Sequence, residues 1–336
     1  MVKMFKYVLL AFLPILIACS KEEPAQDIII DFSGNNNVLN EIVKAGARSY
    51  MVITNADLQG KSFGVYGLRS GTNSSYTIPV FETHSAKQVS YGGGAWGYTP
   101  KAKWVRSNYY RFRAFWPYEN IVEDDLINSG SDANLLSLSY SSGVHNYDLQ
   151  VAYEERYPVT HGVGTVKLVF KHALSAIKFN VKFHESEEGD DNITTFYMTG
   201  LTIVGTLMYG EDGTNATPAD FRWISIYKDS DTKLFQWEGS KQFNKTDAAT
   251  VFDDDDDSDK DGVVFAIPQE IAGGAATINF TTTKGGSALH SASLPATTWE
   301  AGKLYTYNII IKGASISLNV DIADWTGVDS NIDINL

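Results

Sequence analysis

Two neighbouring segments near the end of the chain alternate apolar and polar residues with a period of two. The apolar sets are Tyr305, Tyr307, Ile309 and Ile311, and then Ile316, Leu318, Val320 and Ile322. Successive side chains of a strand point to opposite faces, whereas a helix repeats every 3.6 residues. With Gly313-Ala314-Ser315 between them, the two segments predict a β-hairpin, each strand turning one face to a core.

Other segments of the chain also have strand-like patterns and not helical ones. Residues 109–117 read Tyr-Tyr-Arg-Phe-Arg-Ala-Phe-Trp-Pro, a strand pattern that ends at a proline, which cannot donate to a ladder. Residues 123–146 are rich in Ser, Asn, Asp and Gly and predict a long loop. No stretch has a sustained helical period, and 336 residues exceed one ordinary domain. We therefore predict an all-β protein of two tandem β-sandwiches.

A change of phase marks the predicted domain boundary. Apolar residues occupy even positions from Val166 to Phe170 and odd positions from Ile177 to Phe183. A slip of one residue moves every side chain to the other face, so the strand is predicted to break around His172. We place the boundary near residue 163, with sandwiches over 49–163 and 164–336. His172, beside apolar residues, is predicted to be a packed structural histidine.

The first residues predict an export signal. Lys3 and Lys6 precede an apolar run over 7–17 that is short for a membrane span. The run ends in Leu16-Ile17-Ala18-Cys19, the form of a bacterial lipobox, in which cleavage precedes a cysteine that is then linked to diacylglycerol and acylated on its amine. We predict a cleaved signal peptide over 1–18 and a lipid anchor at Cys19 that holds the chain on the outer membrane.

Cys19 is the only cysteine. The alternative is a small apolar residue at the end of an ordinary signal peptide, but a lone thiol in an exported chain is better explained if lipid consumes it. The following Ser20-Lys21-Glu22-Glu23 resembles the surface export signal of Bacteroidetes lipoproteins. The predicted location is therefore the outer face of the outer membrane.

Residues 19–48 read as a lipidated tether followed by a strand. Residues 20–27 are charged and contain a proline, which suits a flexible tether, and Ile28, Ile30 and Phe32 then alternate with other residues as in a short strand. Arg48 is flanked by small residues in a predicted connector. A trypsin-like protease could reach such a residue, and the alternative is an ordinary solvated loop arginine.

Charge and motifs exclude several function classes. The net charge is −13 and the sequence contains no cluster of Lys or Arg, so nucleic acid is not an expected partner. The six histidines have no metal-ligand spacing, and HExxH and GxSxG are absent; we predict no enzyme and no bound cofactor. Gly92, Gly94 and Gly97 match GxGxxG, but Tyr98-Thr99-Pro100 follows in place of a helix. We interpret this stretch as a glycine-rich hairpin or loop.

An acidic run offers the one candidate metal site. Asp257, Asp259, Asp261 and Gly262 match the DxDxDG core of calcium loops, in which alternate carboxylates converge on one cation. Position twelve, where an EF-hand has Glu, is Pro268. The alternative, which we favour, is a solvated acidic loop.

Several segments, in this order, carry a family resemblance. They are the lipobox, residues 110–117 (Tyr-Arg-Phe-Arg-Ala-Phe-Trp-Pro), 148–152 (Asp-Leu-Gln-Val-Ala), 166–175 (Val-Lys-Leu-Val-Phe-Lys-His-Ala-Leu-Ser), 298–307 (Thr-Trp-Glu-Ala-Gly-Lys-Leu-Tyr-Thr-Tyr) and Asp324-Trp325. Together they resemble the fimbrillins of Bacteroidetes, with departures at Gln150-Val151 and Trp104-Val105. The resemblance spans nearly the whole chain.

The resemblance implies two transthyretin-like β-sandwiches and a role as pilus subunit in adhesion. A trypsin-like protease would cut after Arg48 and remove the lipidated arm with Ile28, Ile30 and Phe32. An identical or related subunit would then donate a strand to the open groove, a form of β-augmentation that builds the fimbria. From their alternation at the chain end, Ile332, Ile334 and Leu336, within residues 328–336, are the candidate donor strand.

A second hypothesis belongs to another class. The chain would keep its lipid and bind glycan or a host or bacterial surface protein through exposed aromatic residues such as Trp96 and Trp104, which can stack on sugars. Processing at Arg48 followed by oligomer formation would distinguish the pilus subunit from this binding lipoprotein.

Overall fold

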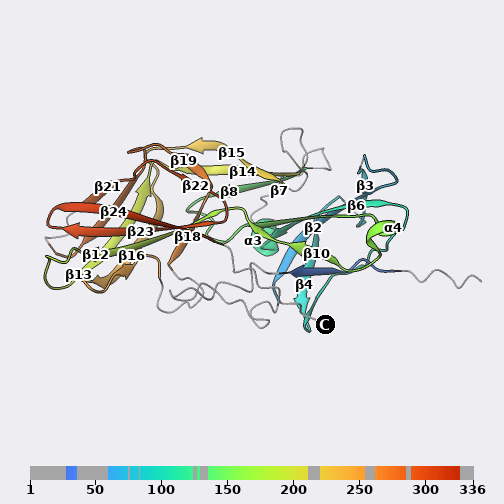
Figure 1. The fold of residues 1–336 in the computed structure, drawn as a ribbon, viewed down its shortest axis with the longest axis horizontal. Helices are drawn as coiled ribbons and strands as arrows, with labels where there is room; N and C mark the ends of the chain where they lie inside the picture. Colours follow the sequence, from blue (N-terminus) through green and yellow to red (C-terminus); the bar gives the residue numbers. More distant parts are fainter. Residues whose placement is uncertain are drawn as a thin grey trace, which may run out of the picture.

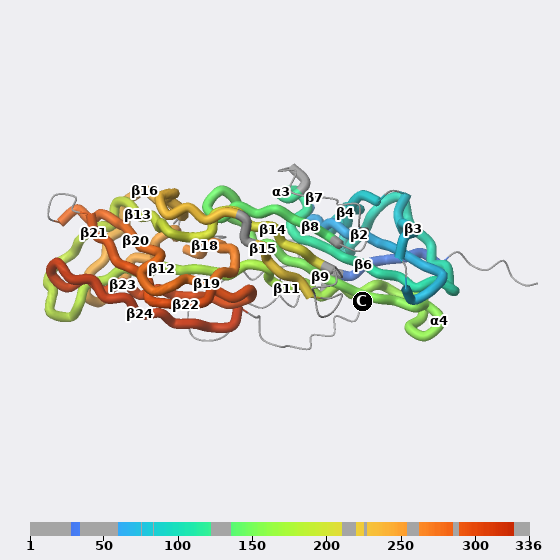
Figure 2. Tube along the Cα trace, turned by 90° about the horizontal axis from the view of Figure 1, so that it is seen from above, coloured from blue at the N-terminus to red at the C-terminus, as the bar shows by residue number. Residues whose placement is uncertain are grey.

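The computed structural model shows an elongated all-β molecule, with strand-rich parts at both ends and a smaller sheet between them (Figures 1 and 2). Its only helices are short within the described residues: α3 (Tyr118–Glu123) and α4 (Pro158–His161). None of the described helices is long and apolar enough to cross a membrane. The structure describes residues 28–35, 60–74, 76–82, 84–123, 127–128, 135–210, 220–253, 262–284 and 289–325.

The end nearer the N-terminus is built on a seven-stranded sheet in the order β11-β9-β6-β2-β4-β5, with β3 paired to β2. Its strands are β2 (Ser62–Ser70), β3 (Ile78–Pro79), β4 (Lys87–Gly92), β5 (Ala95–Gly97), β6 (Tyr109–Trp116), β9 (Gln150–Arg156) and β11 (Lys171–His172). A two-stranded parallel sheet of β1 (Phe32–Asn35) and β10 (Val166–Val169) packs against its inner face, and the two share one core.

The glycine-rich stretch is a hairpin, as predicted. Strands β4 and β5 pair antiparallel, and Gly93 and Gly94 form the turn with φ of 61° and 88°. This left-handed conformation strains residues that carry a Cβ. The GxGxxG match therefore reflects turn geometry and not a dinucleotide site.

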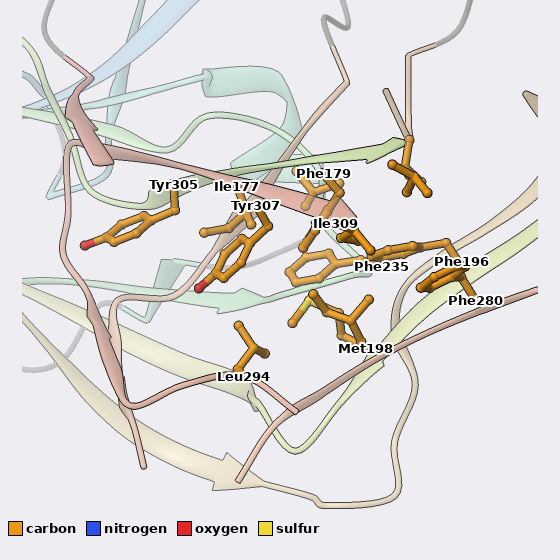
Figure 3. Close-up of a cluster of buried hydrophobic side chains, with 14 of the residues drawn as sticks. Ile177, Phe179, Phe196, Met198, Phe235, Phe280, Leu294, Tyr305, Tyr307 and Ile309 are labelled. Atoms are coloured by element: carbon orange, nitrogen blue, oxygen red, sulfur yellow. The ribbon is translucent and has the colours of Figure 1, made fainter. Parts of the chain in front are cut away.

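The opposite end is a β-sandwich of two sheets, whose facing side chains form a second core. Figure 3 shows Ile177, Phe179, Tyr307 and Ile309 of one sheet converging with Phe196, Met198 and Phe280 of the other. The first sheet contains β12 (Ser175–Phe183), β17 (Ala249–Thr250), β18 (Val263–Ala266), β23 (Lys303–Lys312) and β24 (Ser315–Asp324). The second contains β13 (Asp191–Thr199), β16 (Leu234–Phe243), β20 (Thr277–Thr282) and β21 (Leu289–Ser293), and a separate pair comprises β19 (Gln269–Ile271) and β22 (Thr297–Trp299).

The predicted terminal hairpin is confirmed, but its second strand is less buried than predicted. Strands β23 and β24 pair antiparallel from Lys303 with Asp324 to Lys312 with Ser315. The apolar residues of β23 are buried, whereas those of β24 are half-buried and Ile322 is 59% exposed. The reason is position: β23 lies between two strands, while β24 is the edge strand of its sheet among the described strands.

An antiparallel sheet lies between the two ends. It has the order β15-β14-β8-β7 and packs its apolar face on the outer face of the seven-stranded sheet. The predicted loop over 123–146 is therefore wrong, because it contains a strand whose alternate residues Leu136, Leu138 and Tyr140 are buried among polar neighbours. The strands are β7 (Ile127–Asn128), β8 (Leu135–Ser141), β14 (Thr202–Gly210) and β15 (Phe221–Lys228).

Three strands that follow the predicted boundary pair with strands that precede it. β10 and β11 follow residue 163 but pair with β1 and β9, and β14 pairs with β8 along seven residue pairs. The predicted break in phase is confirmed, since the chain leaves the first end after β11 and enters the second at β12. His172 at this break is 7% exposed, contacts Asp148 at 2.9 Å through Nδ1 and stacks on Trp325 at 3.6 Å. It is a packed histidine, as predicted.

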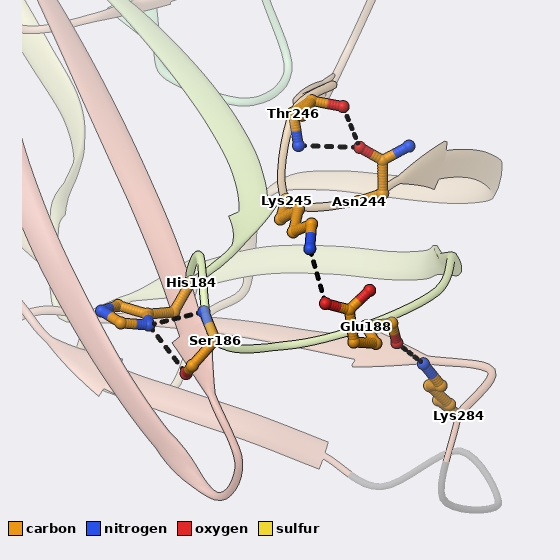
Figure 4. Close-up of polar contacts among 7 residues, drawn as sticks. All are labelled: His184, Ser186, Glu188, Asn244, Lys245, Thr246 and Lys284. Carbon is orange, nitrogen blue, oxygen red and sulfur yellow. Dashed lines mark hydrogen bonds and ion pairs between the residues drawn. The ribbon is translucent and has the colours of Figure 1, made fainter.

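Polar contacts connect the loops at the far end of the sandwich (Figure 4). Lys245 Nζ donates to the Glu188 carboxylate at 2.6 Å, and Lys284 Nζ donates to the Glu188 carbonyl oxygen at 2.9 Å. The hydrogen bond and charge of Lys245 lower the pKa of Glu188. Because this pair is exposed, we assign it a role in loop geometry and little weight in stability.

Candidate functional site

Residues 28–35 form a strand-like segment whose alternate side chains enter the core of the first end. Ile30 is 0% and Phe32 is 4% exposed, Ile28 packs against the same core, and the intervening Ile29 is 42% exposed. The predicted alternation of Ile28, Ile30 and Phe32 is therefore present, with one face toward the core. We call residues 28–35 the inserted segment.

Phe32 lies among four aromatic rings. Its centroid is 5.4 Å from Phe112, 5.5 Å from Tyr98, 6.2 Å from Phe81 and 6.5 Å from Phe63, with near-perpendicular planes toward Phe112 and Phe63. Edge-to-face pairs at these distances add to the stabilisation from burial alone. The pocket that receives Phe32 is thus shaped for a flat side chain.

The backbone of the inserted segment is bonded on two sides. On one side Ile30 N–H donates to Ala102 O, and Trp104 N–H donates to Ile28 O, both at 2.9 Å. On the other, Phe32–Asn35 pairs in parallel with β10, and Val166 N–H donates to Asp31 O at 2.8 Å. The segment fills a slot whose two walls supply main-chain donors and acceptors.

Tyr98 and Lys101 complete the slot. The Tyr98 hydroxyl donates to Ile30 O at 2.6 Å, and burial raises the pKa of Tyr98 to about 12 despite the hydrogen bond from Ala102 N–H. The phenol therefore remains a neutral donor at physiological pH. Lys101 pairs with Asp31 at 2.5 Å, with both side chains partly exposed. Because an exposed ion pair contributes little to the free energy of unfolding, we expect this one mainly to help set the register of the inserted segment.

The slot could receive any extended segment with apolar residues at alternate positions. Its recognition elements are main-chain groups on both walls and a row of apolar side chains that includes Val166 and Leu168, both 0% exposed. Without the inserted segment, β10 would lose its paired partner and these side chains would contact water. Unpaired strand edges of this kind readily accept another strand.

The other predicted site residues lie outside the described residues. These are Cys19, Arg48, the candidate calcium ligands Asp257, Asp259 and Asp261, and the candidate donor residues Ile332, Ile334 and Leu336. Within the described ranges, no group of three His, Cys, Asp or Glu side chains could hold a metal ion.

The predicted aromatic binding residues are not free. Trp104 is 8% exposed and packs edge-on against Tyr110 at 4.7 Å, and Trp96 is half-buried against Phe63 at 4.9 Å and Tyr91 at 5.2 Å. The expected exposure is therefore wrong for Trp104, which belongs to the core, whereas Trp96 is half-buried.

Sequence reasoning missed the receiving walls of the slot. Tyr98, Ala102 and Phe81 lie in loops with no strand period, and Val166 and Leu168 were assigned to the other sandwich. An available signal was the aromatic density of residues 91–104, which exceeds the needs of a solvated loop.

The sequence matches the family model described as fimbrillin-like over residues 52–325. The chain belongs to the fimbrillin-like family. Its fold is similar to that of a fimbrial protein from Bacteroides vulgatus, with 17% identity, a TM-score of 0.56 and coverage of 81% of this chain and 96% of that one.

The fold is also similar to that of a candidate cell adhesion protein from Bacteroides uniformis, with 12% identity, a TM-score of 0.54 and coverage of 90% of this chain and 100% of that one. No curated protein sequence matches the chain. At these identities the solved structures establish the fold, and the family match agrees with the resemblance drawn from the sequence.

Proposed function

We propose that this fimbrillin-like chain is a structural subunit of a cell-surface fimbria and that the inserted segment is a removable plug. The observation that carries the proposal is the insertion of Ile30 and Phe32 into a slot with hydrogen-bonding walls on both sides. The chain would be exported as a lipoprotein anchored at Cys19. Polymerisation would replace the plug by a strand of an identical or related subunit.

Cleavage after Arg48 would release the plug for a simple reason. In the intact chain, residues 36–59 connect the plug to the rest of the fold, so its effective concentration at the slot is in the millimolar range. After a cut in this connection, rebinding becomes bimolecular and the plug dissociates on dilution. A strand from another subunit, present at high local concentration during assembly, would then fill the slot.

The candidate donor is the segment 328–336, with Ile332, Ile334 and Leu336 at alternate positions. These side chains match the spacing with which Ile28, Ile30 and Phe32 occupy the slot, since both sets repeat every two residues. Adhesion would be the role of the assembled fibre.

Limited proteolysis tests the proposal. A soluble chain that begins at Ser20 is treated with trypsin, and the products are followed by mass spectrometry and by size-exclusion chromatography with light scattering. We expect an early cut after Arg48, loss of the N-terminal fragment and oligomers that grow with protein concentration. The matched control is Arg48→Gln, which should stay monomeric. A chain that is cut at Arg48, loses the fragment and remains monomeric at high concentration would contradict the proposal.

A further inference from the structure

Lys101 binds the only charged side chain of the inserted segment, Asp31, with 2.5 Å between Nζ and a carboxylate oxygen. Its Nζ also lies 4.7 Å from the centroid of the Tyr98 ring, whose hydroxyl donates to Ile30 O. The side chains of Lys101 and Asp31 are 38% and 51% exposed, whereas Ile30 and Phe32 on either side of the acid are buried. The slot therefore recognises an acidic residue between two buried apolar ones.

Alternation alone does not fix the register of a strand in this slot. A shift by one residue turns the apolar side chains to solvent, but a shift by two residues keeps the same face inward. In the candidate donor segment 328–336, each of Ile332, Ile334 and Leu336 therefore fits the pocket of Phe32 on this criterion. A second signal is needed to distinguish registers that differ by two residues.

The intervening residues of the candidate donor carry such a signal. They are Asn331, Asp333 and Asn335, and only Asp333 is charged. Residues 332–334 (Ile-Asp-Ile) have the same order of apolar, acidic and apolar side chains as residues 30–32 (Ile-Asp-Phe). The dipeptide Ile-Asp occurs in the sequence at these two places alone. The candidate donor thus repeats the feature that Lys101 recognises in the inserted segment.

Two other triads with an aspartate between large apolar or aromatic residues are engaged within the fold. Residues 320–322 lie in β24, which pairs with β23, and Asp321 accepts a hydrogen bond from the Asn308 side chain at 2.8 Å. In residues 147–149, Asp148 contacts His172 at 2.9 Å. These triads already have partners, so residues 332–334 are the better match to an open slot.

We propose that Lys101 selects the donor strand and sets its register by pairing with Asp333 of a second copy of the chain. This inference rests on the proposed function, because it takes residues 328–336 as the segment that replaces the plug. One isoleucine of the triad would take the position of Ile30 and the other would enter the pocket of Phe32. Because the triad reads the same in both chain directions, the pairing holds for either direction of the donor.

The pairing discriminates between registers more than it strengthens binding. A shift by two residues would place Asn331 or Asn335 beside Lys101 and lose the ion pair. An ion pair with partly exposed side chains changes affinity by only about two- to fivefold. Main-chain hydrogen bonds and apolar burial would supply most of the affinity in every register.

Binding of labelled donor peptides to the cleaved chain tests the pairing. The soluble chain that begins at Ser20 is cut with trypsin, the trypsin is inhibited, and the released fragment is removed. Fluorescence anisotropy then measures the dissociation constant of a peptide of residues 328–336, at protein concentrations below those that give oligomers. We expect this native peptide to bind about two- to fivefold more tightly than the Asp333→Asn peptide.

The matched control is the Asp329→Asn peptide, which loses the same charge outside the triad. It should bind at least as tightly as the native peptide, because the net charge of −13 on the chain opposes acidic peptides. A preference for Asp333 therefore cannot arise from net charge.

Variants of Lys101 show whether this residue causes the preference. In Lys101→Gln, the native and Asp333→Asn peptides should bind equally. In Lys101→Glu the order should reverse, with the Asp333→Lys peptide binding more tightly than the native one. Lys101 is partly exposed, so these replacements leave the core intact, and the peptide series on the wild-type chain needs no protein variant.

Equal affinities of the native and Asp333→Asn peptides for the wild-type chain would overturn the proposal, as would a preference that persists in Lys101→Gln. If no peptide binds a cleaved chain that still forms oligomers, the pairing is wrong and the pilus proposal stands with another donor. If the peptides bind in the expected order but the cleaved chain stays monomeric, the pairing is supported and the pilus proposal is contradicted. The two failures are therefore distinguishable.

Discussion

Ile29 and Ile30 are identical neighbours with opposite environments, 42% and 0% exposed. We expect Ile30→Ala to lower the free energy of unfolding by about 2–5 kcal/mol, because it leaves a cavity beside Phe32. Ile29→Ala should change it by less than about 0.5 kcal/mol. Urea unfolding of both variants checks this, and equal losses would show that the inserted segment does not contribute to the core.

Asp191 is a buried carboxylate in the second end, 4% exposed. Burial raises its pKa, but hydrogen bonds from the Thr283 hydroxyl at 2.7 Å and the Lys284 N–H at 2.8 Å, with others, outweigh burial and hold the pKa below its usual value. The group therefore stabilises the fold fully above its unfolded pKa of about 3.9, and this contribution is lost as pH falls through the lower folded pKa.

Asp191→Asn should accordingly cost about 1–3 kcal/mol at pH 7, since an amide is a weaker acceptor for these donors. The difference from the wild-type chain should shrink below about pH 4. Denaturant unfolding at several pH values measures it. Asp190→Asn, at the exposed neighbour, is the control and should change the free energy of unfolding at pH 7 by less than about 0.5 kcal/mol.

At the scale of elements, the inserted segment should act as a separable strand. A chain that begins at Ser49 should expose the slot and bind a hydrophobic dye, and a synthetic peptide of residues 28–35 should displace the dye and raise the melting temperature, because its main-chain and apolar contacts are regained. A peptide with Phe32→Asp should do neither. Equal effects of the two peptides would exclude specific strand insertion.

Some of this element could be predicted from the sequence. The period of two identified the strand and the buried face of Ile28, Ile30 and Phe32, because alternation depends only on local backbone geometry. The partners of the strand are β10 on one side and residues 102–104 on the other. Their identity depends on contacts between residues distant in sequence, which a local pattern does not encode.

At the scale of the whole molecule, Trp325 connects the two ends. Its ring stacks on His172 of β11 and on Phe265 of β18, with ring centroids 3.6 Å and 5.4 Å apart. Its backbone N–H donates to Gly302 O at 2.7 Å. With the pairing of β8 and β14, this contact should make the molecule unfold as one unit. Trp325→Ala should lower the first melting transition by several degrees and separate it from the second, whereas Trp325→Phe should retain one transition.

Differential scanning calorimetry measures this coupling. If the ends unfold separately in the wild-type chain, or if Trp325→Ala leaves one unshifted transition, the proposed connection is absent. The sequence pattern predicted that His172 is a packed residue and that a strand breaks beside it. It did not indicate that Trp325 would stack there, since the two residues are far apart along the chain.

The sequence by itself determined the all-β class, the terminal hairpin, the glycine-rich turn and the family, because each follows from a local period, a turn residue or an ordered set of short motifs. Only the tertiary structure decided that β8 is a strand in a predicted loop, that β10 and β11 belong to the first end, and that Trp104 is buried and Trp96 half-buried. Alternation shows that a strand has an apolar face, but what covers that face is set by packing against distant segments. For the same reason, the sequence did not indicate that Ile322 would be exposed at a sheet edge or that Arg113 would be buried.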